Sequence, residues 1–132
     1  MTGVQTCALP IFDPQKYTNL AKIDIATGEM KILHSQPQGT NGSSLVTAGD
    51  LVFWGDLNRR FRAHDAETGK ILWETVVGGM IMTSTISYSV NGKQYIAVPS
   101  GLGSLVLGLY PALWPEVEDF PSGAAMFVFT LK

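Results

Sequence analysis

The chain has 132 residues and a formal net charge of −2 at pH 7, with 9 basic and 11 acidic residues. This weakly acidic balance, without a stripe of lysines and arginines, argues against nucleic-acid binding. No apolar run reaches the roughly 18–20 residues that a membrane-spanning helix needs. The 14 glycines and the lack of helical periodicity favour short strands joined by turns. The length fits one small domain.

Residues 1–11 differ from the rest of the chain. Residues 2–11 resemble the in-frame translation of a short-read sequencing adapter, a contaminant of reading frames assembled from metagenomic reads. We therefore expect residues 1–11 to lie outside the fold. A truncated signal peptide is the alternative, but the segment lacks a basic start and its apolar run is short. Cys7 is the only cysteine, so residues 12–132 offer no disulfide or thiolate ligand.

Apolar alternation and turn residues predict an all-β chain. Residues 12–17 indicate an extended lead-in, residues 35–44 a polar loop and residues 101–121 an irregular segment. Asn91-Gly92 is the strongest short-range hairpin signal, because both residues tolerate the positive φ of a two-residue turn. The pattern predicts neither a helix nor a linker between domains. About eight strands are expected from nine candidate segments, residues 20–25, 29–33, 45–47, 51–54, 61–65, 71–77, 83–90, 94–99 and 124–131.

The segment from Phe61 to Trp73 predicts a tight hairpin. Asp65 is placed to accept hydrogen bonds from backbone N–H groups inside the turn, and Gly69 can adopt positive φ without Cβ strain. Ile71 and Trp73 share one face of the return strand, because side chains alternate along a strand. We therefore expect a hairpin that carries one buried indole.

The same turn occurs earlier in the chain. Residues 24–28 repeat the Asp-x-x-Thr-Gly core of residues 65–69, 41 positions before it. A repeat of about 40–45 residues built from short strands is typical of β-propeller blades. The alternative is a β-sandwich that contains two unrelated hairpins.

Residues that could carry chemistry are scattered along the sequence. His34 and His64 lie on different hairpins without the spacing of a metal site, which favours structural or solvated histidines. Asp56, near Arg59 and Arg60, could form a charged patch, but a solvated turn is the simpler interpretation. The acidic residues at positions 116–119 indicate a solvated loop rather than a catalytic carboxylate pair. The residues alone therefore predict no catalytic set.

The pattern Ala63-x-Asp65-x-x-x-Gly69-Lys70-x-x-Trp73 resembles the tryptophan-docking motif of the quinoprotein alcohol dehydrogenases. Members of this methanol/ethanol dehydrogenase family are eight-bladed propellers that carry pyrroloquinoline quinone (PQQ), and their motif tryptophan packs between neighbouring blades. All the motif positions match. The flanking residues also resemble the family's neighbouring strands, so the resemblance covers residues 12–132.

Individual positions depart from the family pattern. Ile32 stands where the first repeat would carry its motif tryptophan. Arg60 lies in a turn where many relatives have an aromatic residue that faces the cofactor. Residues 100–103 resemble the family's loop near the quinone. The resemblance thus implies Leu102, Gly103 and Arg60 as cofactor-binding residues.

The resemblance implies that residues 12–132 are the last two to three blades of a periplasmic PQQ-dependent alcohol dehydrogenase. Such an enzyme oxidises an alcohol with the quinone, uses calcium or a lanthanide ion, and passes electrons to a cytochrome c-type acceptor. The family's catalytic aspartate and metal ligands lie upstream, so no catalytic or metal-binding residue is expected here. The remaining blades would be partners of this chain. A non-catalytic propeller with the same repeats, such as an outer-membrane assembly scaffold, is the alternative.

Overall fold

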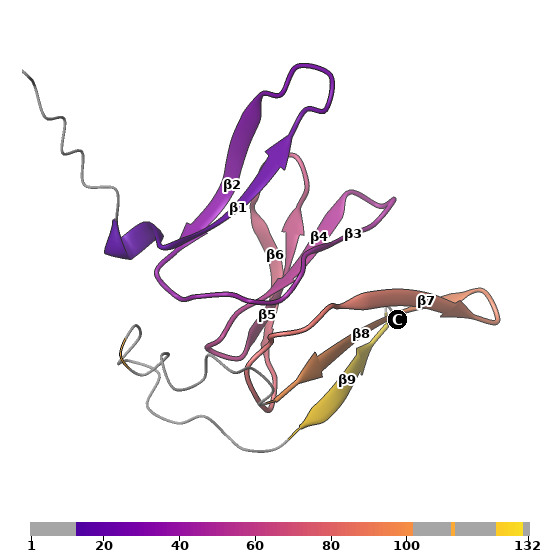
Figure 1. Cartoon of the computed structure of the whole chain (residues 1–132). Coiled ribbons are helices and arrows are strands. Elements are labelled where there is room, and N and C mark those ends of the chain that lie inside the picture. The colour runs from indigo at the N-terminus through magenta and orange to yellow at the C-terminus, as the bar shows by residue number, and fades with distance from the viewer. Residues whose placement is uncertain (1–12, 102–111, 113–123, 131–132) are drawn as a thin grey trace, which may run out of the picture.

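Nine strands and a short 3₁₀ helix are found in the part of the chain that the structure, a computed structural model, describes: residues 13–101, 112 and 124–130 (Figure 1). The helix η1 is Pro14–Lys16, and strands β1 to β9 are Thr18–Ile23, Met30–Gln36, Leu45–Val46, Leu51–Gly55, Arg60–Asp65, Ile71–Val76, Ile86–Val90, Lys93–Ser100 and Ala125–Phe129. They form three antiparallel sheets with the orders β1-β2, β3-β4-β5-β6 and β7-β8-β9. The all-β prediction is confirmed.

The differences from the expected elements lie at their ends. The prediction of an extended lead-in over residues 12–17 is wrong, because Pro14–Lys16 form a 3₁₀ helix. Asp13 caps this turn by accepting a hydrogen bond from Gln15 N at 2.9 Å, a helix-start signal that the sequence interpretation missed. Strand β2 continues to Gln36, into the expected polar loop, because it stays paired with β1 to its end. Strand β7 begins at Ile86, three residues later than expected.

The two Asp-x-x-Thr-Gly turns have closely similar conformations. Asp65 Oδ1 accepts hydrogen bonds from the backbone N–H groups two and three residues on, at 3.1 and 2.7 Å. Asp24 Oδ1 accepts the equivalent bonds at 2.8 and 3.0 Å. Gly69 and Gly28 end the turns with φ of +78° and +76°. Hydrogen bonds from Thr68, first by its side chain and then by its backbone, hold the pKa of Asp65 below its ordinary value.

Two apolar clusters lie between consecutive sheets. One joins β1–β2 to the four-stranded sheet and contains Leu20, Val52 and Trp54. The other joins the four-stranded sheet to β7–β9 and contains Phe61, Val77, Ile81, Ile96 and Val98. Consecutive sheets therefore share buried apolar contacts, and repeat arrays draw their stability from such neighbour interfaces.

Trp73 is less buried than the sequence predicts. It keeps 40% of its surface exposed, because it lies on β6, the outer strand of the four-stranded sheet. Its ring nevertheless makes edge contacts with Phe61, at a centroid distance of 6.2 Å, and with Phe129 of the next sheet, at 5.2 Å. The expectation of a fully buried indole is wrong for this chain, but the indole does contact the neighbouring sheet.

Gly69 meets two constraints at once. Its φ of +78° disfavours any residue with a Cβ, and a Cβ at this position would lie 2.0 Å from Leu33 O of the preceding sheet. Gly28 has almost the same φ, but a Cβ there would have nothing within 4 Å. Both glycines therefore need the positive φ, but only Gly69 also needs the space that a Cβ would fill.

We expect Gly28→Ala to lower the free energy of unfolding by about 1–2 kcal/mol, the cost of the left-handed conformation. Gly69→Ala should cost at least about 2 kcal/mol more, because a backbone atom rather than a flexible side chain meets the new methyl group. Urea unfolding of the two variants provides the measurement. Equal losses would show that the close approach to Leu33 is unimportant.

Candidate functional site

Three connecting segments come together at one end of the sheets. Ile81 N, in the β6–β7 connection, donates to Asp56 O in the β4–β5 turn at 3.1 Å. Gly101 N, after β8, donates to Met80 O at 2.9 Å. Arg60, which the resemblance implies as a cofactor-binding residue, begins β5 at this end, just after the turn. Two of the expected cofactor-binding residues, at positions 102 and 103, follow Gly101 and lie outside the described residues.

A buried ionic network lies next to this end. Asp56 is fully buried, and its Oδ2 accepts a hydrogen bond from Arg62 Nη1 at 2.8 Å. Arg62 also donates through Nε to Glu74 Oε2 at 2.5 Å and through Nη1 to Gln36 Oε1 at 3.0 Å. The interpretation of Asp56 as a solvated turn residue is therefore wrong. Its salt-bridge partner is Arg62 of β5, whereas Arg60 contacts it through the backbone N–H, at 3.0 Å.

Arg60 is engaged with Glu74, the carboxylate that also binds Arg62. Arg60 Nη1 lies 2.6 Å from Glu74 Oε1, with 41% of the arginine side chain exposed. Burial by itself would raise the pKa of Glu74, but the hydrogen bond and charge of Arg62, followed by those of Arg60, lower it below its ordinary value. Arg60 is thus a half-exposed cation at the edge of the buried network.

The five motif positions lie together in the β5–β6 hairpin. Ala63 is buried and pairs with Trp73 across the strands. Asp65 organises the turn, and Lys70 O accepts the backbone hydrogen bond of Asp65 N at 2.9 Å. Gly69 lies against the preceding sheet, as described above. The motif residues therefore form one compact hairpin, with contacts to the sheets on both sides.

His34 and His64 are brought together although they lie on different hairpins. Their ring centroids are 5.0 Å apart, and His64 is fully buried. Burial is the largest cause that lowers the pKa of both imidazoles below the ordinary value of 6.5. Sequence reasoning missed this pair because the contact joins two sheets, and no spacing along the chain signals it.

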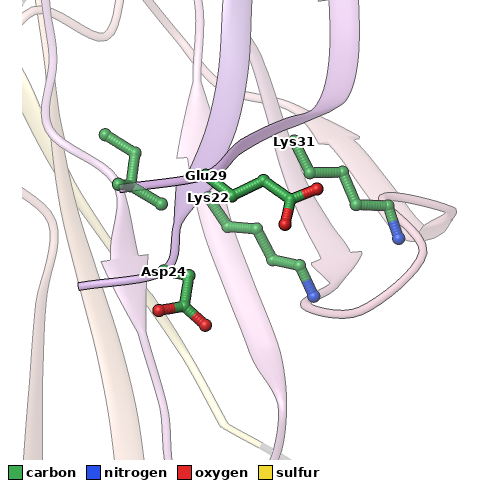
Figure 2. Close-up of a pocket in the computed structure, with 5 residues that line it drawn as sticks. Lys22, Asp24, Glu29 and Lys31 are labelled. Carbon is green, nitrogen blue, oxygen red and sulfur yellow. The ribbon is translucent and has the colours of Figure 1, made fainter. Parts of the chain in front are cut away.

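A shallow hollow lies beside the β1–β2 turn. It has a volume of about 350 Å³ and is lined by Lys22, Ile23, Asp24, Glu29 and Lys31. Figure 2 shows the side chains of Lys22, Glu29 and Lys31 extending to the same side of the hairpin. Both lysines already pair with Glu67 of the neighbouring turn. Because both lysines are already paired and the hollow is open to solvent, it does not have the enclosed, mostly apolar character of a cofactor pocket.

The described residues contain no cluster of side chains typical of a metal site. Within residues 13–101, 112 and 124–130 there is no group of three or more histidine, cysteine, aspartate or glutamate side chains that could hold a metal. Arg60 is the only expected cofactor-binding residue in these ranges, and its charge is already paired. The same ranges contain no helix with the length and apolar character needed for a membrane crossing.

Residues 15–96 match the model of a family described as glucose/ethanol/alcohol dehydrogenase, β-propeller domain. The dehydrogenase subunit of a quinone alcohol dehydrogenase from Acetobacter aceti is 40% identical over 100 residues, which are 76% of this chain and 12% of that protein. Subunit 1 of a cytochrome c methanol dehydrogenase from Methylobacterium organophilum is 34% identical over 111 residues, covering 82% of this chain and 16% of that protein.

Among solved structures, a europium-containing methanol dehydrogenase aligns with a TM-score of 0.65 and 28% identity, over 83% of this chain and 22% of that chain. This chain spans between 9% and 19% of the length of the curated relatives considered. The likeness therefore concerns a small part of each relative.

We expect Arg62→Met to lower the free energy of unfolding by about 3–5 kcal/mol, because it leaves Asp56 buried without its cation. Lys22→Met is the matched control, since it removes a lysine from an exposed pair with Glu67 and should cost less than about 1 kcal/mol. Denaturant unfolding at pH 7 measures both. Similar small losses would mean that water reaches Asp56 and that the network is not buried in solution.

Proposed function

The chain belongs to the PQQ family of β-propeller domains found in glucose, ethanol and other alcohol dehydrogenases, and we propose that it forms neighbouring blades of a PQQ-dependent alcohol dehydrogenase. The match over residues 15–96 carries this proposal, since that segment contains both Asp-x-x-Thr-Gly turns and the motif that ends at Trp73. We assign residues 12–132 to the propeller and residues 1–11 to the adapter-derived segment. The short span of the relatives that is covered supports further blades outside this chain.

The proposed reaction is the oxidation of an alcohol, with bound PQQ as the group that accepts the electrons. We assign the metal site, and with it most of the quinone site, to blades outside this chain, because the described residues contain no cluster of potential metal ligands. The europium-containing methanol dehydrogenase supports a metal of the calcium or lanthanide class. The cytochrome c methanol dehydrogenase supports a cytochrome c-type acceptor. The proposed location is the periplasm, by resemblance to the family.

The proposed role of the β5–β6 hairpin is to tie three blades together. Gly69 supports it through the close approach to Leu33 on one side. Trp73 supports it through the edge contact with Phe129 on the other side. Because the indole contacts the sheet that follows in sequence, we assign Trp73 the docking function of the family motif.

The proposed contribution to the cofactor side comes from Leu102, Gly103 and Arg60. Arg60 begins β5 at the end where the connecting segments converge. Its ion pair with Glu74 would orient the guanidinium and limit its reach. We therefore assign Arg60 to the rim of the quinone site and not to a direct clamp on the quinone.

The test is to express the longer gene that carries residues 12–132 and to load the product with PQQ and either calcium or a lanthanide. We expect alcohol-dependent reduction of a dye or of cytochrome c. The 132-residue chain under the same conditions should give no turnover above the blank, because it lacks a metal site in its described residues. A longer product that binds no PQQ would overturn the proposal and favour a non-catalytic scaffold propeller.

We expect Trp73→Ala to destabilise the longer protein by about 2–4 kcal/mol, near the range for buried aromatic residues but reduced by partial exposure. Leu72→Ala is the control, because Leu72 is the neighbouring residue of the same strand, is 52% exposed and should cost less than about 1 kcal/mol. Denaturant unfolding measures both variants. Equal losses for the two would argue against docking by Trp73.

A further inference from the structure

The contact between β1–β2 and the four-stranded sheet contains a pair of histidines, of which His64 is buried and His34 is half-buried. His34 of β2 and His64 of β5 lie with ring centroids 5.0 Å apart and ring planes inclined by 56°. Trp54 of β4 lies 6.0 Å from each ring, so the three rings form one aromatic group. His64 has no exposed surface. The pair therefore joins a half-buried imidazole of one sheet to a fully buried imidazole of the other.

The hydrogen bond of His64 to Gly69 defines the tautomer of its neutral ring. Its Nδ1 lies 3.0 Å from the carbonyl oxygen of Gly69. Because a carbonyl can only accept, Nδ1 carries the proton, and in the neutral ring Nε2 is the bare nitrogen. Among the described residues, Nε2 has no hydrogen-bond partner. A second proton would therefore create a buried imidazolium whose new N–H has nothing to donate to.

The charges around the pair are already balanced. Arg62 lies between two carboxylates, and a second arginine shares one of them. The other neighbours are the uncharged indole of β4, a neutral amide of β2 and the carbonyl of the β5–β6 turn. The two carboxylates that face the pair, Asp56 and Glu74, are therefore already paired with arginines. The charged groups that face the pair are Arg62 of β5, Asp56 of the β4–β5 turn and Glu74 of β6.

The contact on the other side of the four-stranded sheet has a different composition. Its buried cluster consists of apolar side chains, and Phe53, Phe127 and Phe129 pack against it. Trp73 joins this group through its contact with Phe129. Protonation near neutral pH leaves such a contact unchanged, because none of these side chains titrates.

We propose that the His34–His64 pair makes the contact between β1–β2 and the four-stranded sheet proton-sensitive, so that it loosens in mild acid while the contact with β7–β9 persists. The consequence is a propeller segment whose blades separate in a defined order as the pH falls. This property depends on the geometry of the pair and holds whether or not the proposed dehydrogenase function is correct.

The direction of the pH effect follows from the two imidazoles. Burial, then the charges of His64 and Arg62, lowers the pKa of His34. Burial lowers the pKa of His64; the bond to Gly69 opposes it, Arg62 acts in the same direction as burial, and the charge of Glu74 opposes it. Unfolded histidines then bind protons at a higher pH than folded ones. The stabilising contribution is therefore complete above a pH of about 6.5 and decreases as the pH falls towards the folded pKa values.

The first measurement is a proton NMR titration of the 132-residue chain. The chain has two histidines, so its spectrum contains two imidazole C2–H signals, and His34→Phe assigns them. We expect both to titrate below a pH of about 6.5, the ordinary value for the side chain. Titration of both signals at or above this value would overturn the proposal.

The second measurement is hydrogen exchange followed by mass spectrometry between pH 7.5 and 5.5, corrected for intrinsic exchange rates. This window lies above the ordinary pKa of carboxyl groups, about 4. We expect peptides from β1 and β2 to lose at least threefold in protection, with little change in β8. Uniform loss across all sheets, or no loss in β1 and β2, would overturn the proposal.

His34→Phe should remove most of the pH-dependent loss in β1 and β2, because it keeps a ring against Trp54 but cannot take up a proton. Lys31→Gln is the control, since it alters an exposed ion pair between the same two sheets and should leave the pH-dependent loss in place. Full retention of the loss in His34→Phe would contradict the role of the pair.

Discussion

The arrangement of the sheets depends on the β5–β6 hairpin, because this one element contacts the sheet before it and the sheet after it. On one side, Gly69 approaches Leu33 so closely that a Cβ would come within 2.0 Å of its carbonyl oxygen. On the other side, Trp73 meets Phe129 at a centroid distance of 5.2 Å. The missing side chain of Gly69 thus sets the distance of the hairpin from β1–β2, and the indole of Trp73 sets its distance from β7–β9. Since both belong to the same hairpin, the two spacings are coupled.

The two contacts between sheets differ in chemistry. The contact with β7–β9 is aromatic and aliphatic. The contact with β1–β2 contains a small apolar cluster and several polar links, among them the bond from Arg62 to Gln36 and the pairs that Glu67 makes with Lys22 and Lys31. Ile32 gives a reason, because it stands at the place of Trp73 in the first repeat and is 52% exposed. Without an indole there, directional polar bonds contribute more to that contact.

Local features of the fold could be predicted from the sequence because they depend on neighbouring residues. The Asp65 turn, the positive φ of Gly69 and the Asn91-Gly92 hairpin, with φ of 51° and 77°, all follow the chemistry of a few adjacent positions. Burial was less predictable, as Asp56 and Trp73 show. Asp56 is buried because Arg62 reaches it from the next strand. Trp73 is half exposed because β6 is an outer strand.

The contact between His34 and His64 was also beyond prediction from the sequence. It forms only when two sheets pack, and the residues are 30 positions apart without a repeat relation. The positions of Leu102 and Gly103 relative to Arg60 cannot be predicted from local sequence either, because they depend on how loops of different blades approach one another. For these two residues the family resemblance, and not local pattern, is the basis of the assignment.

The buried network of Asp56 and Arg62 fixes the β4–β5 turn through charged groups. Asp56 Oδ1 accepts from Arg60 N at 3.0 Å, which closes its own turn, while Oδ2 binds Arg62. Ile81 packs over Gly55, where a Cβ would lie 2.5 Å from the isoleucine side chain, and its N–H bonds to Asp56 O. The Asp56 carboxylate thus links the β4–β5 turn to Arg62 of β5, and Ile81 links the same turn to the β6–β7 connection.

The linkage continues into the third sheet through Met80 O, which accepts from Gly101 N at 2.9 Å. The residue that begins β5 and the residue that follows β8 are therefore held by a continuous series of short-range contacts. A site shared between blades requires such fixed relations, since its groups come from segments far apart in sequence. Desolvation of Asp56 costs free energy that its pairing with Arg62 offsets, and the result is a rigid edge from which Arg60 projects as a half-exposed cation.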